Sequence, residues 1–166
     1  MKTQGHNSER RQKGFSLIEL LIVVAIILII AAIAIPNYLR SRMAANESSA
    51  AGTMRTYTSA LISYQTQCPT LGFPAGVANI GPGPGDCTNA NLVDNVLGTA
   101  PVTKNGYSFN YLAGGSAPIS TFSLTGAPIT CNASGVRSYF TDQTAVIRFT
   151  DTSSCPAADS SSSALQ

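Results

Sequence analysis

The sequence predicts an α+β protein in which a long N-terminal helix packs on a C-terminal antiparallel sheet of three to four strands. Three observations carry this prediction. An uninterrupted apolar run occupies residues 20–35, and an apolar stripe at helical spacing follows it as far as Cys68. Four short segments between residues 106 and 150 then alternate apolar and polar residues, which is typical of strands. The 166 residues are enough for one domain of this kind.

Residues 1–14 form a short basic leader in front of the apolar run. The leader contains four cations and one anion, which are Lys2, Arg10, Arg11, Lys13 and Glu9. From Phe15 onward the chain carries six cations and seven anions, so that part is close to neutral and shows no basic patch for nucleic-acid binding. Because basic residues flank the cytoplasmic end of membrane helices, the leader predicts a cytoplasmic N-terminus and a body outside the cytoplasm.

Residues 15–36 predict a hydrophobic transmembrane helix. At ~1.5 Å per residue the segment spans roughly 30 Å, which matches the hydrocarbon core of a bilayer. Glu19 is the one charged residue in the segment and stands near its front edge. A carboxylate in a membrane helix is costly, on the order of 2.5–3.5 kcal/mol at mid-helix, and usually has a partner. Pro36 cannot donate a hydrogen bond to the carbonyl of Ala32, so it predicts a bend in the helix.

The helix is expected to continue outside the membrane over residues 37–67 as an amphipathic half. Its apolar stripe recurs at intervals near 3.5 residues and consists of Leu39, Met43, Ala50, Met54, Tyr57, Leu61, Tyr64 and Cys68. We interpret this stripe as the core-facing side of the helix and not as a cofactor site. Pro69 ends the helix.

Residues 70–105 are expected to form a long surface loop, because the run Gly-Pro-Gly-Pro-Gly at 81–85 excludes helix and central strand. The sheet is predicted within residues 106–150, and its strand-like segments are Tyr107–Tyr111, Ile119–Leu124, Val136–Phe140 and Ala145–Phe149. The last two segments would form a hairpin through residues 141–144. Residues 151–166 are expected to be an exposed, mobile tail.

Four cysteines, Cys68, Cys87, Cys131 and Cys155, follow the apolar run. None of them forms a C-x-x-C pair, so a zinc site is not indicated. An even number of cysteines behind an export-type segment indicates two disulfides, for which three connectivities exist. We predict Cys68–Cys87 and Cys131–Cys155, because sequential pairing keeps each ring local at about 20–25 residues.

The residues of catalysis are missing from the predicted body of the chain. The one histidine is His6 in the leader, so a Ser-His-Asp or Cys-His arrangement cannot form after residue 14. The aspartates are scattered and match no calcium-binding loop. We therefore expect no enzyme, no catalytic residue, no cofactor and no metal.

The stretch Gly-Phe-Ser-Leu-Ile-Glu-Leu at residues 14–20, behind a basic leader, resembles the class III signal of type IV prepilins. The resemblance is close from Gly14 to Pro36 and extends to the general layout of the rest. It implies that a membrane-embedded aspartyl peptidase cuts between Gly14 and Phe15 and then N-methylates Phe15. It also implies that the apolar segment is retained for assembly, with Glu19 partnering the N-terminal amine of Phe15 on a neighbouring subunit. Pro36 would then mark a local bend of the helix.

The resemblance implies the pilin fold and the role of a structural subunit of a type IV pilus, of type IVa character. Such a subunit is a single-pass protein of the bacterial inner membrane before assembly, with an extracytoplasmic globular part, here residues 37–166. It then polymerises with its own copies into an extracellular filament for adhesion, twitching motility or related surface functions. Its partners would be the prepilin peptidase and methyltransferase and the pilus assembly machinery, with no requirement for nucleic acid.

Three alternatives stay open at the level of the sequence. A pseudopilin of a type II secretion system would share residues 14–36, and so would a minor pilin that primes or tips a fibre. Two disulfides and the absence of a calcium loop favour a true pilin over a pseudopilin, and Glu19 speaks against a minor pilin. A secreted binding domain behind a signal cleaved after Ala34 would explain the basic leader, but not the length of the apolar run or Glu19.

Overall fold

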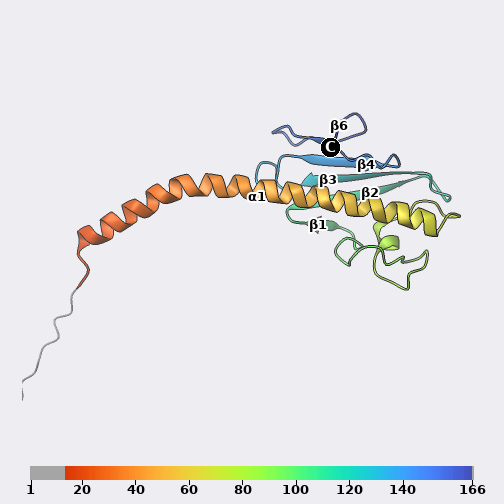
Figure 1. The fold of residues 1–166 in the computed structure, drawn as a ribbon, viewed down its shortest axis with the longest axis horizontal. Helices are drawn as coiled ribbons and strands as arrows, with labels where there is room; N and C mark the ends of the chain where they lie inside the picture. The colour runs from red at the N-terminus through yellow and green to blue at the C-terminus, as the bar shows by residue number, and fades with distance from the viewer. Residues whose placement is uncertain (1–13, 166) are drawn as a thin grey trace, which may run out of the picture. The chain divides into compact units, whose positions relative to one another are not determined.

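The computed structural model describes residues 14–165, and the leader before Gly14 lies outside this range. The chain divides into an N-terminal unit that ends at Tyr38 and a second unit that begins at Leu39, which we call the head. Figure 1 shows the order of the elements. Their bounds are α1 Leu17–Gln67, the 3-10 helix η1 Val77–Ile80, β1 Val102–Lys104, β2 Tyr107–Gly114, β3 Thr121–Pro128, β4 Ser138–Asp142, β5 Arg148–Thr150 and β6 Ser163–Ala164.

Helix α1 runs through Pro36 and ends directly before Cys68 and Pro69. A proline inside a helix removes its own backbone hydrogen bond and crowds the preceding turn, and the apolar residues around Pro36 still favour helix. The long helix predicted from the apolar run and the stripe is therefore confirmed.

In the head, α1 lies along one face of the sheet (Figure 1) and buries most of the predicted stripe. The buried members are Ala50, Met54, Tyr57, Leu61, Tyr64 and Cys68. The first two members differ, since Leu39 is 49% exposed and Met43 is half-buried. The first side chains of α1 that hydrogen-bond to the rest of the head are those of Asn46 and Glu47, which follow these two members along the helix.

The antiparallel sheet has six strands in the sequential order β1 to β6, where three to four were predicted. The additional strands are β1, at the end of the expected loop, and β6, within the expected tail. Both are too short to show an alternation of apolar and polar residues. The sequence did hold one signal for β1: Asn105-Gly106, with φ of 48° and 76°, forms the tight turn that joins β1 to β2.

Most residues of the tail are exposed, as predicted, but the tail is also ordered against the sheet, because β6 pairs with β5. Ala158 is buried, and the Leu165 N–H donates to the carbonyl oxygen of Ile147 at 2.7 Å. A guanidinium N–H of Arg148 also donates to the carbonyl oxygen of Ser162 at 3.2 Å. These bonds order a serine-rich segment, although its composition alone indicates disorder.

Tyrosines hold the loop after α1 in place. The hydroxyl groups of Tyr57, Tyr64 and Tyr111 donate to backbone carbonyl oxygens of Leu97, Cys87 and Pro74, at 2.6, 2.7 and 2.7 Å. Two further tyrosine hydroxyls bond in the same way around the start of the head, from Tyr107 to Arg137 and from Tyr139 to Glu47. A loop with little regular structure is thus tied to the core at several points.

Candidate assembly segment

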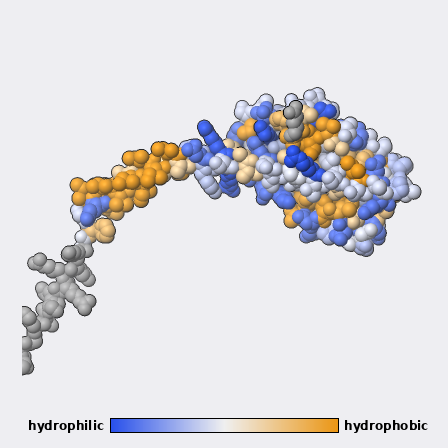
Figure 2. All heavy atoms as spheres, viewed as in Figure 1, coloured by the Kyte–Doolittle hydropathy of each residue, from blue (hydrophilic) through white to orange (hydrophobic). Residues whose placement is uncertain are grey.

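Residues 17–35 of α1 form an apolar cylinder whose large side chains are exposed in the single chain. The exposed fraction of these side chains ranges from 44% at Val24 to 75% at Leu17. Figure 2 shows this part of the helix as a continuous hydrophobic surface. The helix is long and apolar enough to cross a membrane. Because soluble monomers rarely expose a surface of this kind, it needs lipid or other apolar helices around it.

The first turn of α1 explains how Glu19 is held. The Ser16 N–H donates to Oε2 of Glu19 at 2.9 Å, which is one half of the capping box that the pattern S-x-x-E forms. The carboxylate therefore lies at the positive end of the helix dipole, where a negative charge is favourable. Sequence reasoning missed this local role, although Ser16 and Glu19 stand at the capping-box spacing.

Phe15 and Gly14 precede this cap and are exposed. Phe15 is 87% exposed, and a side chain at Gly14 would meet no atom within 4 Å. Phe15 and Glu19 therefore lie at the same end of α1, while Pro36 lies well inside the helix. Small residues near the far end of the apolar run, Ala31, Ala32 and Ala34, would let another helix approach closely.

Glu47 joins α1 to the start of β4 in the head. Its Oε1 accepts hydrogen bonds from the backbone N–H groups of Val136 and Arg137 at 2.8 and 3.3 Å. Its Oε2 lies 3.9 Å from Nε of Arg137, whose guanidinium lies over the ring of Phe149. The Glu47 side chain is 16% exposed, so this is a partly buried ion pair. The sequence alone does not indicate this role, because Val136 and Arg137 lie 89 and 90 residues from Glu47 along the chain.

Two disulfides join distant segments of the head. Cys68 pairs with Cys87, and Cys131 pairs with Cys155, which is the sequential connectivity. The first bond joins the end of α1 to the loop, and Cys68 is 2% exposed. The second bond joins the turn before β4 to the segment after β5, and Cys131 is exposed. The two bonds thus differ in their access to solvent.

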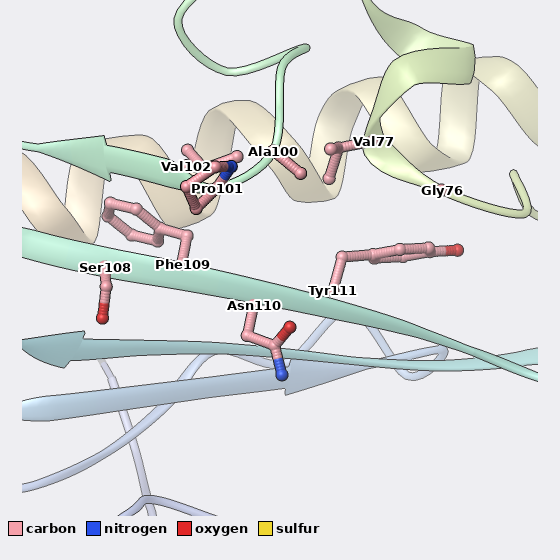
Figure 3. A pocket seen from close by; sticks show the side chains of 9 residues that line it. All are labelled: Gly76, Val77, Ala100, Pro101, Val102, Ser108, Phe109, Asn110 and Tyr111. Carbon is pink, nitrogen blue, oxygen red and sulfur yellow. The ribbon is translucent and has the colours of Figure 1, made fainter.

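A cavity of about 610 Å³ in the head offers no group for acid–base chemistry. It lies between β2, the end of the loop and the start of η1 (Figure 3). Phe109 and Tyr111 point to one side of β2, and Ser108 and Asn110 point to the other. The hydroxyl of Tyr111 is bound to Pro74, and burial raises its pKa, which keeps it protonated. Within residues 14–165, no three His, Cys, Asp or Glu side chains are placed to hold a metal ion.

Comparison with known proteins gives matches that concentrate on the N-terminal segment. The family described as "Prokaryotic N-terminal methylation motif" matches residues 10–35. The Type IV wide pilus major component PilA4 of Thermus thermophilus is 62% identical over 39 residues, which are 24% of this chain and 30% of that protein. The N-terminal segment of this chain is therefore similar to that of type IV pilins.

Two longer matches extend this similarity into the head. The Type IV major fimbrial protein FimA of Dichelobacter nodosus is 45% identical over 86 residues, which cover 50% of this chain and 47% of FimA. The Type IV major pilin protein PilA of Myxococcus xanthus is 34% identical over 96 residues, with 51% and 44% covered. The chain thus spans less than half the length of each of these relatives. No solved structure matches the chain.

Proposed function

We propose that this chain is a structural subunit of a type IV pilus. The observation that carries the proposal is the exposed apolar helix of residues 17–35, which begins directly after Gly14-Phe15 and carries Glu19 in its first turn. In the inner membrane this helix satisfies its own backbone hydrogen bonds in lipid, with the N-terminus in the cytoplasm. In the filament the same surface exchanges lipid for the helices of neighbouring subunits. The filament would serve adhesion, twitching motility or a related surface function.

Processing of the leader is the first step of this proposal. A prepilin peptidase would cut between Gly14 and Phe15 and N-methylate Phe15. Gly14 supports this assignment, because a residue without a side chain lets the backbone enter a narrow protease site in extended form. The exposure of Phe15 supports it as well. The chain itself would have no catalytic role and no cofactor.

Glu19 would guide assembly through its free carboxylate oxygen. Oε2 accepts the Ser16 N–H, while Oε1 accepts no hydrogen bond within residues 14–165. Cleavage after Gly14 creates a cationic amine at Phe15, so a neighbouring subunit could present this amine to Oε1 without breaking the cap. In an apolar bundle such a pair gains strength from the low dielectric, and it supplies direction that apolar packing lacks. Pro36 would allow the helix to unwind locally in the filament.

A pseudopilin of a type II secretion system and a minor pilin are the alternative functions. The matched relatives are named as major pilus, fimbrial and pilin proteins, which supports the role of a main filament subunit. A secreted domain behind a signal cleaved after Ala34 would lose the apolar helix, which is the segment that supports the proposed function.

Deletion of the gene, followed by imaging of the cell surface, tests the proposed function. Cells that lack the chain should lack filaments, and the wild-type gene should restore them. Filaments sheared from the restored cells should contain this chain as their most abundant protein. Unchanged filaments in the deletion strain, or filaments in which the chain is a trace component, would contradict the proposal.

A further inference from the structure

One pocket of the head is lined by hydrogen-bond donors and a cation. It has a volume of about 390 Å³ and lies beside the first turns of α1 within the head. Its polar lining consists of Arg42, Asn46, Asn105, Thr130 and Ser134. No carboxylate lines it. We call it the Arg42 pocket.

The walls of the Arg42 pocket are held in place by hydrogen bonds between distant segments. Arg42 and Asn46 are four residues apart and share one face of α1. Nδ2 of Asn46 donates to the carbonyl oxygen of Ser134 at 2.9 Å. Nδ2 of Asn105 donates to the hydroxyl oxygen of Ser49 at 2.7 Å. These two bonds fix the walls of the pocket to α1 in the single chain.

The guanidinium of Arg42 has no partner within residues 14–165. The one ion pair in this part of the chain joins Arg137 to Glu47, and Arg42 donates no hydrogen bond there. A guanidinium offers five N–H donors in a planar fork, which fits a carboxylate better than any other side chain. The amides and hydroxyls around it can bind the same carboxylate. The pocket thus offers a positive charge and several donors to an oxyanion, and a carboxylate is the oxyanion that another copy of this chain can supply.

Within residues 39–165, one side-chain carboxylate accepts no hydrogen bond at either of its oxygens. Five other carboxylates of the head already accept hydrogen bonds within the subunit, and these are Glu47, Asp86, Asp94, Asp142 and Asp159. Asp151 is exposed and accepts no hydrogen bond within residues 14–165. It lies directly after β5, in the segment that the second disulfide closes. Arg42 and Asp151 therefore carry opposite charges, and neither side chain has an ion-pair or hydrogen-bond partner within residues 14–165.

We propose that Asp151 of one subunit enters the Arg42 pocket of a second copy of this chain in the filament. This inference rests on the proposed function. The two patches differ, so the contact is heterologous, and a heterologous contact that does not close on itself produces an open helical assembly. Apolar helices slide and rotate past one another with little cost. A charged contact between heads fixes which rotation the incoming subunit adopts.

Charge reversal with rescue tests this contact in cells that produce the full chain. Arg42→Asp should lower the yield of sheared filaments about tenfold relative to membrane-bound subunit, because it places two carboxylates together. Asp151→Arg should do the same. The double variant, which exchanges the two charges, should recover at least half of the parental yield. Arg40→Asp is the matched control and should leave the yield within twofold, since residues two apart point to different sides of a helix.

A cross-linking experiment identifies the contact even if the reversed variants fold poorly. In filaments of Arg42→Lys, a carbodiimide should join the lysine amine to Asp151 and produce covalent dimers that contain this link. Filaments of Arg40→Lys should not yield a link to Asp151. Normal filaments from Arg42→Asp, no recovery in the double variant, or dimers without the link would each overturn the contact while leaving the proposed function intact. Absence of filaments from the parent chain would instead contradict the proposed function.

Discussion

At the scale of single residues, the head depends on polar groups that bond across long sequence distances. Glu47 is the clearest case, since one side chain accepts two backbone N–H groups and pairs with Arg137. Without the carboxylate, both N–H groups would lose their partner in a partly buried place. Removal of such a carboxylate lowers the free energy of unfolding by more than the mean contribution of a hydrogen bond, because the N–H donors stay desolvated without a partner.

We predict that Glu47→Ala lowers the free energy of unfolding of the head by about 2–3 kcal/mol. Glu47→Gln keeps an acceptor oxygen and should lose only about 1 kcal/mol. Urea unfolding of the full chain in detergent, followed by near-ultraviolet circular dichroism, measures both. Gln65→Ala, on the exposed side of α1, is the control and should stay within about 0.5 kcal/mol of the parent. Equal stability of Glu47→Ala and the parent would show that the sheet is held to α1 by apolar contacts alone.

The core tyrosines make stability depend on alkaline pH. Burial raises the pKa of Tyr57, Tyr107 and Tyr111 well above 10.0, the ordinary value, and it also raises the pKa of Tyr64 and Tyr139. Below pH 10 these groups are protonated in both the folded and the unfolded chain, so they add no dependence on pH. Above pH 10 the unfolded chain loses protons that the folded chain keeps, and the free energy of unfolding therefore falls as pH rises.

We predict that the head is stable at pH 9 and loses stability steadily from about pH 10 upward. Absorbance of tyrosinate should rise together with unfolding, since the buried hydroxyls ionise when their carbonyl partners are released. A pH titration that follows tyrosinate absorbance and circular dichroism in one sample measures this coupling. Full ionisation of the tyrosines in a chain that still shows the native spectrum would contradict it.

At the scale of elements, α1 could be predicted from the sequence because two strong signals join in it. The apolar run and the helical stripe are each long, and neither contains a strand-like alternation. Periodicity could not reveal the strands β1 and β6, because two or three residues carry none, and the turn at Asn105-Gly106 was the signal that could have indicated β1. The order of the tail depends on Ala158 and on bonds to Ile147, which are set by tertiary packing and not by the local composition.

The candidate assembly segment could be predicted from its sequence motif, whereas the side-chain geometry of the head could not. Gly14, Phe15, Glu19 and Pro36 stand at spacings that a family resemblance makes visible. The cap formed by Glu19 could have been predicted from the capping-box spacing, whereas the Arg42 pocket became visible only from the placement of side chains.

The first turn of α1 gives a prediction that separates two roles of Glu19. Glu19→Gln keeps an oxygen that can accept the Ser16 N–H, but it removes the charge that would attract a neighbouring amine. We expect Glu19→Gln and Glu19→Ala to insert and to be cleaved normally, and both to assemble at least tenfold less filament, as loss of a buried charge pair costs about 3–5 kcal/mol. Glu19→Asp should be intermediate, because its charge survives with a shorter reach.

Sheared-filament yield, compared with membrane-bound subunit in the same cells, is the measurement for these variants. Normal assembly of Glu19→Gln together with failure of Glu19→Ala would show that Glu19 acts only as a helix cap. Normal assembly of both would show that packing alone sets the register of the subunits.

The two disulfides should differ in their response to a reductant. Cys131 is exposed and Cys155 is half-buried, whereas Cys68 is buried and Cys87 is half-buried, and a thiolate must reach a sulfur to open the bond. We predict that a mild dithiol opens Cys131–Cys155 first, while Cys68–Cys87 stays closed until the head unfolds. Each bond should stabilise the head by roughly 3 kcal/mol in the chain-entropy model. Differential alkylation followed by peptide mapping measures the order, and opening of Cys68–Cys87 first would contradict it.

At the scale of the whole molecule, the chain combines two units that require different surroundings. The N-terminal unit exposes apolar side chains in every direction and is stable only in lipid or among other helices. The head has its own core, two disulfides and a nearly neutral charge, which suits a subunit that leaves the membrane. Under the proposed function the chain would keep residues 15–35 after export, because these residues would join one subunit to the next.

The intact mass of the chain recovered from surface filaments tests this central claim most directly. We predict a chain that begins at Phe15, carries one methyl group on its N-terminal amine and contains two disulfides. N-terminal peptide analysis of the same sample locates the methyl group. A mature chain that begins at Ile35 would contradict the account, because the assembly helix would have been discarded, and so would a filament subunit that still begins at Met1.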